Sequence, residues 1–290
     1  MYLRCPLPAK GPTTRRIRAY LTCSTLQARK NATSRRVQGT SVSVELMEIQ
    51  NVEHQTIPMR PQDPGTATLV FIVRDLDVAL TRARQANAAI VTPKGTAVTL
   101  ADGTHAILIR DVDSRLIELR QSAGSATANA TASNILEMRL SITVADLEQT
   151  TRVYRDALGF NVAAETPFNG DAGTRALTGL TNADVRRSRV QAPGSTLWIE
   201  FVEYKGVDRA PHRMRIQDRG AARLQLRAQN LDALVDSMKR AGLTIVSVGG
   251  TAVPIPPNLK GALVADPNNF FLTPFAPCDG CAPTLAPQPR

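Results

Sequence analysis

The stretch of sequence that decides the fold occurs twice in this chain. The first copy, residues 45–87, reads ELMEIQNVEHQTIPMRPQDPGTATLVFIVRDLDVALTRARQAN, and the second, residues 200–242, reads EFVEYKGVDRAPHRMRIQDRGAARLQLRAQNLDALVDSMKRAG. The copies are offset by 155 residues, which is the separation of Glu45 and Glu200. Further identical pairs at this offset are Met59 and Met214, Arg60 and Arg215, Gln62 and Gln217, Asp63 and Asp218, and Asp111 and Asp266. A repeat of this length is too long for a solenoid unit, so it predicts a duplicated domain.

Length and composition indicate a globular protein of about two domains. The chain has 290 residues, of which 43% are hydrophobic and 21% are charged, as is ordinary for globular proteins. Its net charge is +10. The basic residues are scattered, apart from the pairs Arg15-Arg16, Arg35-Arg36 and Arg186-Arg187, and no aromatic residues are interleaved with them. We therefore expect a solvated basic surface and no interface for nucleic acid.

The cysteines and the hydropathy pattern argue against several classes of protein. Cys5, Cys23, Cys278 and Cys281 all lie outside the repeated stretches. Cys278 and Cys281 form a lone CxxC in a proline-rich tail, which indicates a tail decoration or an opportunistic disulfide rather than a zinc site. No apolar run is long enough to span a membrane, and no apolar segment follows the N-terminal arginines as in a secretory signal. We expect a cytoplasmic protein with no membrane partner.

Hydrophobic periodicity predicts a βαβββ unit in each repeat. Residues 67–73 read as a buried strand, and residues 76–89 have the apolar spacing of a helix, with short strands following to residue 119. Further helices are predicted from Leu147 to Leu158, with Gly159 as C-cap, and from Leu231 to Ala241. Residues 122–133 read SAGSATANATAS, a composition typical of a linker.

These patterns divide the chain into five segments. They are a poorly ordered segment or partial first module at 1–40, a first domain at 41–120, a linker at 121–133, a second domain at 134–276 and a tail at 277–290. The second domain begins near Leu136, whose counterpart at the repeat offset would precede Met1. We therefore expect the first domain to lack its opening strand and helix. Either the start codon is assigned too late, which we favour, or the missing strand is supplied by a neighbour or left as an open edge. A homodimer is one of the expected forms.

Three motifs resemble the vicinal-oxygen-chelate superfamily, which includes glyoxalase I, bleomycin-resistance proteins, fosfomycin-resistance enzymes and extradiol dioxygenases. They are Val144-Ala145-Asp146-Leu147 at a helix start, Tyr154-Arg155-Asp156-Ala157-Leu158-Gly159-Phe160 at its end, and Asp266-Pro267-Asn268-Asn269 before the last strand. The resemblance covers residues 41–276. It implies an α+β protein with tandem glyoxalase-like domains, each made of paired βαβββ modules that form a curved, partly closed sheet around a ligand cleft. Active members hold a divalent metal in this cleft, on histidine and glutamate.

The resemblance also implies where the metal ligands would lie. They come from the first strand of a module, seven residues before the helix cap, and from the last strand. In the second domain these positions hold Arg139, Glu200, Arg223 and Thr273, and in the first domain they hold Glu45, Thr68 and Glu118. Guanidinium groups donate hydrogen bonds only and cannot bind a metal. We therefore predict no metal or other cofactor and, if any metal binds, Glu45 and Glu118 as its ligands. The three histidines, His54, His105 and His212, fall outside these positions.

Two interpretations of the arginine positions remain open. Arg139 and Arg223, held by Glu200, would suit a small anionic organic ligand, or the three would form a salt-bridge cluster in a former metal site. The first interpretation predicts a ligand-binding protein comparable to the bleomycin-resistance branch. A second function class is a metal-dependent lyase, isomerase or dioxygenase. A third is a structural role without a ligand. Whether the protein is an enzyme is undecided. Tyr154 lies on the apolar stripe of its helix, so we assign it to the core.

Overall fold

The computed structural model describes residues 18–22, 29–36, 42–49, 52–121, 133–211, 213–255 and 258–278. Most of the predicted linker, the tail from residue 279 and His212 lie outside the described residues, as do Cys5, Cys23 and Cys281. Cys278, at the end of the last described range, is disulfide-bonded.

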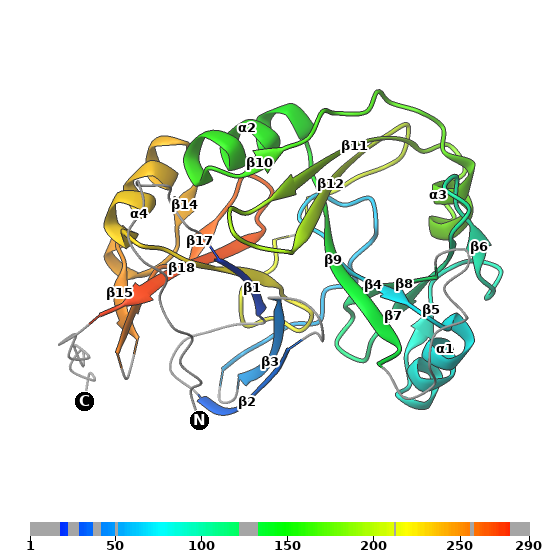
Figure 1. Ribbon diagram of the computed structural model, residues 1–290, viewed down its shortest axis with the longest axis horizontal. Helices are drawn as coiled ribbons and strands as arrows, with labels where there is room; N and C mark the ends of the chain where they lie inside the picture. The colour runs from blue at the N-terminus through cyan, green and yellow to red at the C-terminus, as the bar shows by residue number, and fades with distance from the viewer. Residues whose placement is uncertain are drawn as a thin grey trace.

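One sheet is built from the middle of the chain and is called the middle sheet. It has nine strands and occupies one end of the molecule, in green and cyan in Figure 1. Its strands run in the order β10 (Asn161–Val162), β11 (Asp184–Gln191), β12 (Trp198–Lys205), β9 (Ile135–Thr143), β4 (Ala67–Val73), β8 (Leu116–Gln121), β7 (His105–Arg110) and β5 (Ala89–Ile90), and β6 (Val98–Thr99) pairs with β7.

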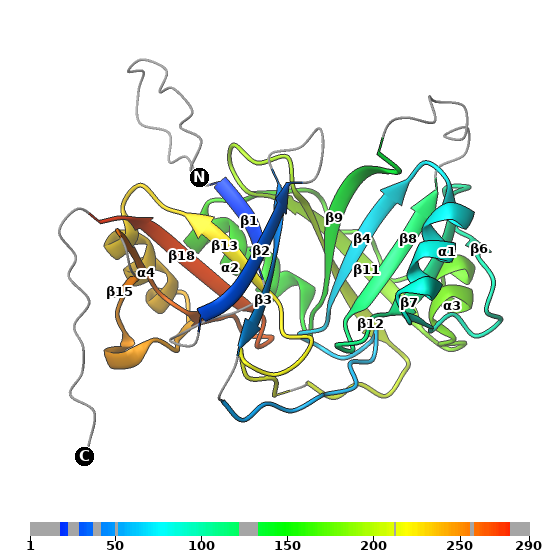
Figure 2. The same cartoon turned by 90° about the horizontal axis from the view of Figure 1, so that it is seen from below.

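The other sheet is built from the two ends of the described chain and is called the terminal sheet. It also has nine strands and lies at the opposite end of the molecule, as Figure 2 shows. Its strands run in the order β14 (Thr244–Ile245), β17 (Val264–Ala265), β18 (Phe271–Pro277), β13 (Arg223–Arg227), β1 (Arg18–Thr22), β3 (Ser43–Ile49) and β2 (Arg29–Arg36), with β15 (Val253–Ile255) and β16 (Leu259–Gly261) beside β18.

Both sheets combine strands from the two halves of the chain. β4 pairs antiparallel with β9 in the middle sheet, and β1 pairs antiparallel with β13 in the terminal sheet. The segment 122–132 joins β8 to β9, two strands of the same sheet. The expectation that modules would pair within 41–120 and within 134–276 is therefore wrong, because each range contributes to both sheets. The α+β architecture of paired modules in curved sheets is as predicted.

Strand β1 takes the place of an opening strand. It pairs parallel with β3 and antiparallel with β13, just as β9 pairs parallel with β12 and antiparallel with β4. The prediction that the first repeat lacks its opening strand is therefore wrong. Only residues 23–28 separate β1 from β2, too few for a helix as long as the ten-residue α1 (Leu76–Gln85). The short separation between β1 and β2 agrees with the prediction that the helix of this module is missing.

Two crossing segments carry the chain between the sheets, and they bond to each other reciprocally. The first (52–66) leads from β3 to β4, and the second (206–211 and 213–222) leads from β12 to β13. The backbone N–H of Gln55 donates to Asp218 Oδ1 at 2.9 Å. At the repeat offset, the backbone N–H of Ala210 donates to Asp63 Oδ1, also at 2.9 Å. The duplicated aspartates therefore join the two repeats around a local two-fold relation.

We predict that Asp218→Ala destabilises the fold by about 2–3 kcal/mol, because it removes the acceptor of two partly buried backbone hydrogen bonds and of the ion pair with Arg215. Asp218 also accepts from the backbone N–H of Arg215 at 2.7 Å and is 4% exposed. Urea unfolding measures the loss, and Asp63→Ala is expected to show a similar one. Asp236→Ala, on an exposed helical position, serves as the control and changes stability by less than about 0.5 kcal/mol. Wild-type stability in both crossing-segment variants would contradict the prediction.

Three helices begin at side-chain caps that the sequence pattern indicated. The carboxylates of Asp75 and Asp146 accept from the third helical N–H of α1 and of α2 (Leu147–Leu158), each at 2.9 Å. Asn230 does the same for α4 (Leu231–Arg240) at 3.0 Å. α2 ends at Gly159, whose φ of 68° lies in the left-handed region that suits glycine. The predicted cap and bounds of α2 are thereby confirmed.

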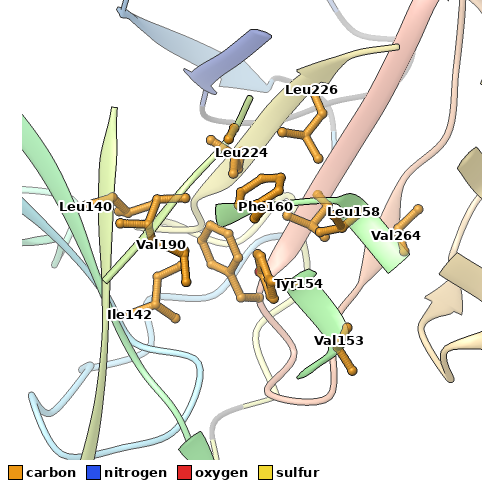
Figure 3. Packing of buried hydrophobic residues seen from close by; sticks show 14 of the residues in the cluster. Leu140, Ile142, Val153, Tyr154, Leu158, Phe160, Val190, Leu224, Leu226 and Val264 are labelled. Carbon is orange, nitrogen blue, oxygen red and sulfur yellow. The ribbon is translucent and has the colours of Figure 1, made fainter. Parts of the chain in front are cut away.

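The main core lies between the two sheets, where α2 and α4 run side by side (Figure 1). Figure 3 shows Tyr154 of α2 at its centre, and this residue is fully buried. Its ring packs edge-on against Phe201 and Phe160, with centroids at 4.7 and 5.5 Å. Tyr154 is therefore a core residue, as predicted. Its hydroxyl donates to Asp266 Oδ2 at 3.2 Å.

Asp266 is a buried carboxylate at the turn before β18. Its Oδ1 accepts the backbone N–H groups of Asn268 at 2.8 Å and Phe270 at 2.9 Å. Burial raises the pKa of Asp266 from 3.8 to about 6, although these hydrogen bonds oppose the shift. Because the folded state holds this proton more tightly than the unfolded state, the group favours folding below pH 4. Its contribution is lost as pH rises from about 4 to about 6.

We predict that wild type loses about 3 kcal/mol relative to Asp266→Asn between pH 4 and pH 7, from the two-unit shift. The asparagine amide keeps an acceptor for the backbone donors and stays neutral throughout. Urea unfolding of both proteins across this range measures the difference. A difference that does not vary with pH would contradict the raised pKa.

Candidate functional site

The concave face of the middle sheet encloses two adjoining cavities. The larger, of about 210 Å³, is lined from β4, β8, β9, β11, β12 and α3 (Ala172–Thr178). The smaller has a volume of about 90 Å³. The two cavities share Arg120, Ser141, Arg189 and Glu200 in their linings. Together they form the candidate ligand site.

The site combines equivalent positions of two modules. Glu118 on β8 lies opposite Val70 on the parallel strand β4, and Glu200 on β12 lies opposite Ser141 on the parallel strand β9. Because β4 and β9 pair antiparallel, the two glutamates occupy corresponding places in the modules that the sheet joins. Both line the larger cavity.

The structure brings together four of the residues that the sequence singled out. Thr68 and Glu118 come from the first repeat, and Arg139 and Glu200 come from the second; all four line the two cavities. They were assigned to two separate domains, and they meet because β4 pairs with β9.

The remaining predicted site residues lie elsewhere. Arg223, Thr273 and Glu45 belong to β13, β18 and β3 of the terminal sheet. There Arg223 Nη2 lies 3.9 Å from Glu45 Oε2, and Thr273 is 6% exposed. The predicted grouping of Arg139 and Glu200 with Arg223 and Thr273 is therefore wrong. The suggested metal pair of Glu45 and Glu118 is also wrong, because strand pairing places the two residues in different sheets.

Three arginines of the site were missed in the sequence. Arg120 lies on β8 two residues after Glu118, and Arg187 and Arg189 lie on β11 opposite Val202 and Glu200. Arg187 had been assigned to a solvated surface pair. The signal that could have found them is the two-residue spacing, which places side chains on one face of a strand.

Each carboxylate beside the small cavity is already held by a guanidinium group. Glu118 Oε1 accepts from Arg120 Nε at 2.7 Å. Glu137 accepts from Nε and Nη2 of Arg139 at 2.7 and 2.9 Å. In both pairs the partners are two residues apart on one strand, so the sheet itself holds them together. Glu200 is the partner of Arg189, at 3.4 Å.

Ion pairing and burial together shift the pKa values of the site residues. The hydrogen bond to Glu137 raises the pKa of Arg139, although burial and the charge of Arg120 oppose it. Burial lowers the pKa of Arg120, but the charge of Glu118 and the hydrogen bond to it produce a net rise. Burial raises the pKa of Tyr204 to about 12, so its phenol stays protonated at the edge of the larger cavity.

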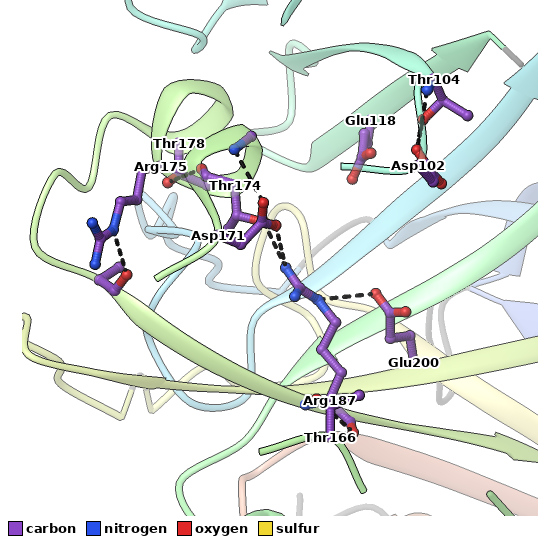
Figure 4. Close-up of polar contacts among 12 residues, drawn as sticks. Asp102, Thr104, Glu118, Thr166, Asp171, Thr174, Arg175, Thr178, Arg187 and Glu200 are labelled. Carbon is purple, nitrogen blue, oxygen red and sulfur yellow. Dashed lines mark hydrogen bonds and ion pairs between the residues drawn. The ribbon is translucent and has the colours of Figure 1, made fainter. Parts of the chain in front are cut away.

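Helix α3 forms one wall of the larger cavity, and the sequence did not predict it. It has seven residues, many of them small, and no clear apolar period. Gly173 lets it approach the loop after β6, because a Cβ there would lie 2.9 Å from the Cα of Leu100. Figure 4 shows Arg187 reaching from β11 toward both α3 and β12. Arg187 Nη2 donates to Thr174 Oγ1 at 2.6 Å, and Arg187 Nε lies 3.7 Å from Glu200 Oε2.

The residues present do not fit the metal that the resemblance implies. The four equivalent positions hold Thr68, Glu118, Arg139 and Glu200, so only two carboxylates are available, and both are paired with arginine. A metal of this kind needs about three protein donors with lone pairs. Within the described ranges, no group of three His, Cys, Asp or Glu residues could hold a metal ion.

Residues 138–268 match the model of the Glyoxalase/Bleomycin resistance protein/Dioxygenase superfamily. The chain therefore carries a glyoxalase-like domain of this superfamily, as its motifs predict. No curated protein sequence is significantly similar to the chain.

Two structures of glyoxalase I from Zea mays support the same fold. Glyoxalase I from Zea mays is 15% identical and has a TM-score of 0.57, over 91% of this chain and 92% of that one. A mutant of glyoxalase I from Zea mays, also 15% identical, has a TM-score of 0.54 over 90% and 94% of the two chains. A glyoxalase family protein from Bacillus cereus is 14% identical, with a TM-score of 0.46 over 52% of this chain and 100% of that one. At these identities the likeness to the Zea mays enzyme concerns the fold alone.

Within the described ranges, no helix is long and apolar enough to cross a membrane.

We predict that the purified protein binds no stoichiometric zinc, nickel, manganese or iron, because the available carboxylates are neutralised by arginine. Elemental analysis after incubation with each metal and desalting measures this. One equivalent of metal, lost in Glu118→Ala and in Glu200→Ala but kept in Glu45→Ala, would overturn the prediction. Glu45→Ala is the matched control because Glu45 lies in the other sheet.

Proposed function

We propose that the protein binds a small organic anion in the middle-sheet cavities, through arginine rather than through a metal. The observation that carries this proposal is the lining of the small cavity. Arg120, Arg139 and Arg189 line it together with a single carboxylate, that of Glu200. Guanidinium groups are well suited to carboxylates and phosphates, because their planar N–H donors match these anions.

The acidic partners support this function by orienting the arginines. Arg139 donates Nε and Nη2 to Glu137, which leaves its Nη1 without a partner among the described residues. Arg120 uses Nε and Nη2 with Glu118 in the same way. Holding a long side chain in place beforehand reduces the conformational entropy that binding would otherwise cost.

The lining of the small cavity offers several donors to one anion. Arg120 and Arg139 both line it, so a carboxylate there can meet two guanidinium groups. The hydroxyl of Ser141, which lines both cavities, can donate a further hydrogen bond.

The alternative function, a metal-dependent lyase, isomerase or dioxygenase, has one observation in its favour. Glu118 and Glu200 occupy equivalent positions and line one cavity, as ligands of a shared ion would. Their arginine partners compete with a cation for the same oxygens. We therefore favour binding of an organic anion, and the metal analysis above separates the two functions.

We predict that Arg139→Ala weakens binding of a carboxylate roughly tenfold to a hundredfold, the loss of one or two charge-assisted hydrogen bonds. Calorimetric titration with benzoate, cyclohexanecarboxylate, lactate and succinate measures the affinities, and Arg120→Ala is expected to behave similarly. Arg152→Ala, an arginine on the exposed face of α2, is the matched control and binds like wild type. The proposal fails if none of these carboxylates binds. It also fails if the corresponding amides, which carry no charge, bind as tightly as the acids.

A further inference from the structure

The small cavity contains an apolar feature that the proposed anion site does not use. Trp198, the only tryptophan of the chain, lies on β12 directly beside Arg139 of β9. It lines the small cavity, yet it is 39% exposed. A large aromatic side chain on a wall of a polar cavity offers a flat apolar surface next to the cationic groups.

No other aromatic ring and no cation packs on the face of this indole in the described part of the chain. The ring pairs there join Tyr154 to Phe160 and Phe201. The cations placed over an aromatic ring, those of Arg186 and Lys205, lie over Phe168. Because Trp198 also lines the cavity and is partly exposed, its ring can be reached by a ligand. Stacking on such a ring adds to what is gained from area burial alone.

The lining and volume of the small cavity suit a ring next to a charged group. A second apolar side chain in the lining is that of Val70, which lies beside Arg139 on the other neighbouring strand, β4. Arg139 thus stands between an aliphatic and an aromatic side chain on consecutive strands. The cavity volume of about 90 Å³ is several times what one water molecule requires. A ring with an acidic group would place the ring along Trp198 and the acid against the arginines.

We infer that the ligand class of this site is a planar aromatic carboxylate, with its ring stacked on Trp198 and its carboxylate held by Arg120 and Arg139. The inference rests on the proposed anion-binding function and narrows it to one chemical class. It assigns Trp198 as the residue that selects planar over saturated ligands.

The test compares benzoate with cyclohexanecarboxylate, which have the same charge and the same number of ring carbons, but only benzoate is planar. We expect wild type to bind benzoate roughly three to ten times more tightly in calorimetric titration, the range of aromatic pair energies. Benzoate is also expected to change the fluorescence of the protein, because Trp198 is its only tryptophan.

Two variants separate the inference from the function on which it rests. Trp198→Leu is expected to abolish the preference while cyclohexanecarboxylate still binds, and Trp198→Phe to restore part of it. Arg139→Ala is expected to lower the affinity for both ligands by the same factor. Equal affinity of wild type for both ligands, or a preference that survives in Trp198→Leu, overturns the inference but leaves the anion site standing. If neither ring acid binds wild type, the inference is wrong, and if lactate and succinate also fail to bind, the proposed function is wrong as well. Circular dichroism spectra that match wild type show that each variant is folded.

Discussion

The reciprocal bond between the two crossing segments is the constraint on which the rest of the structure depends. Asp63 and Asp218 are copies of one residue, and each accepts a backbone N–H from the opposite repeat. Each is also bound by an arginine three residues earlier, Arg60 or Arg215. A nearly buried carboxylate is tolerated only when such partners satisfy it. This exchange ties each repeat to the other and directs each crossing segment from one sheet to the other.

The candidate ligand site is a consequence of that exchange. Because the first repeat leaves the terminal sheet at residue 49 and enters the middle sheet at residue 67, β8 with Glu118 and Arg120 faces β12 with Glu200. Charges that the chain places at least 80 residues apart then share one cavity. Their balance decides the chemistry, because arginines neutralise both carboxylates at the positions where relatives with a metal need lone pairs. The same arginines retain N–H groups that an anion can use.

Local features were predictable because their physical causes are local. The bounds of α2 followed from Asp146 as N-cap and Gly159 as C-cap, and the burial of Tyr154 followed from the apolar stripe between them. Helix α3 was missed because its seven residues carry no clear apolar period. The role of Arg187 was missed for another reason. Its partner Thr174 lies 13 residues before it in the sequence, and its partner Glu200 lies 13 residues after it. Only the pairing of β11 with β12 and the position of α3 bring them within reach.

By itself, the sequence determined the modules of this protein: the duplication, the helix caps, the strands and the residues at the family's ligand positions. These follow from periodicity and from side chains that bond to backbone a few residues away. Only the tertiary structure decided which modules share a sheet, and so which charges meet. Two equivalent copies of a module can pair within a repeat or between repeats with nearly the same strand contacts. The choice depends on the long-range bonds of Asp63 and Asp218, which have no signature in the local pattern.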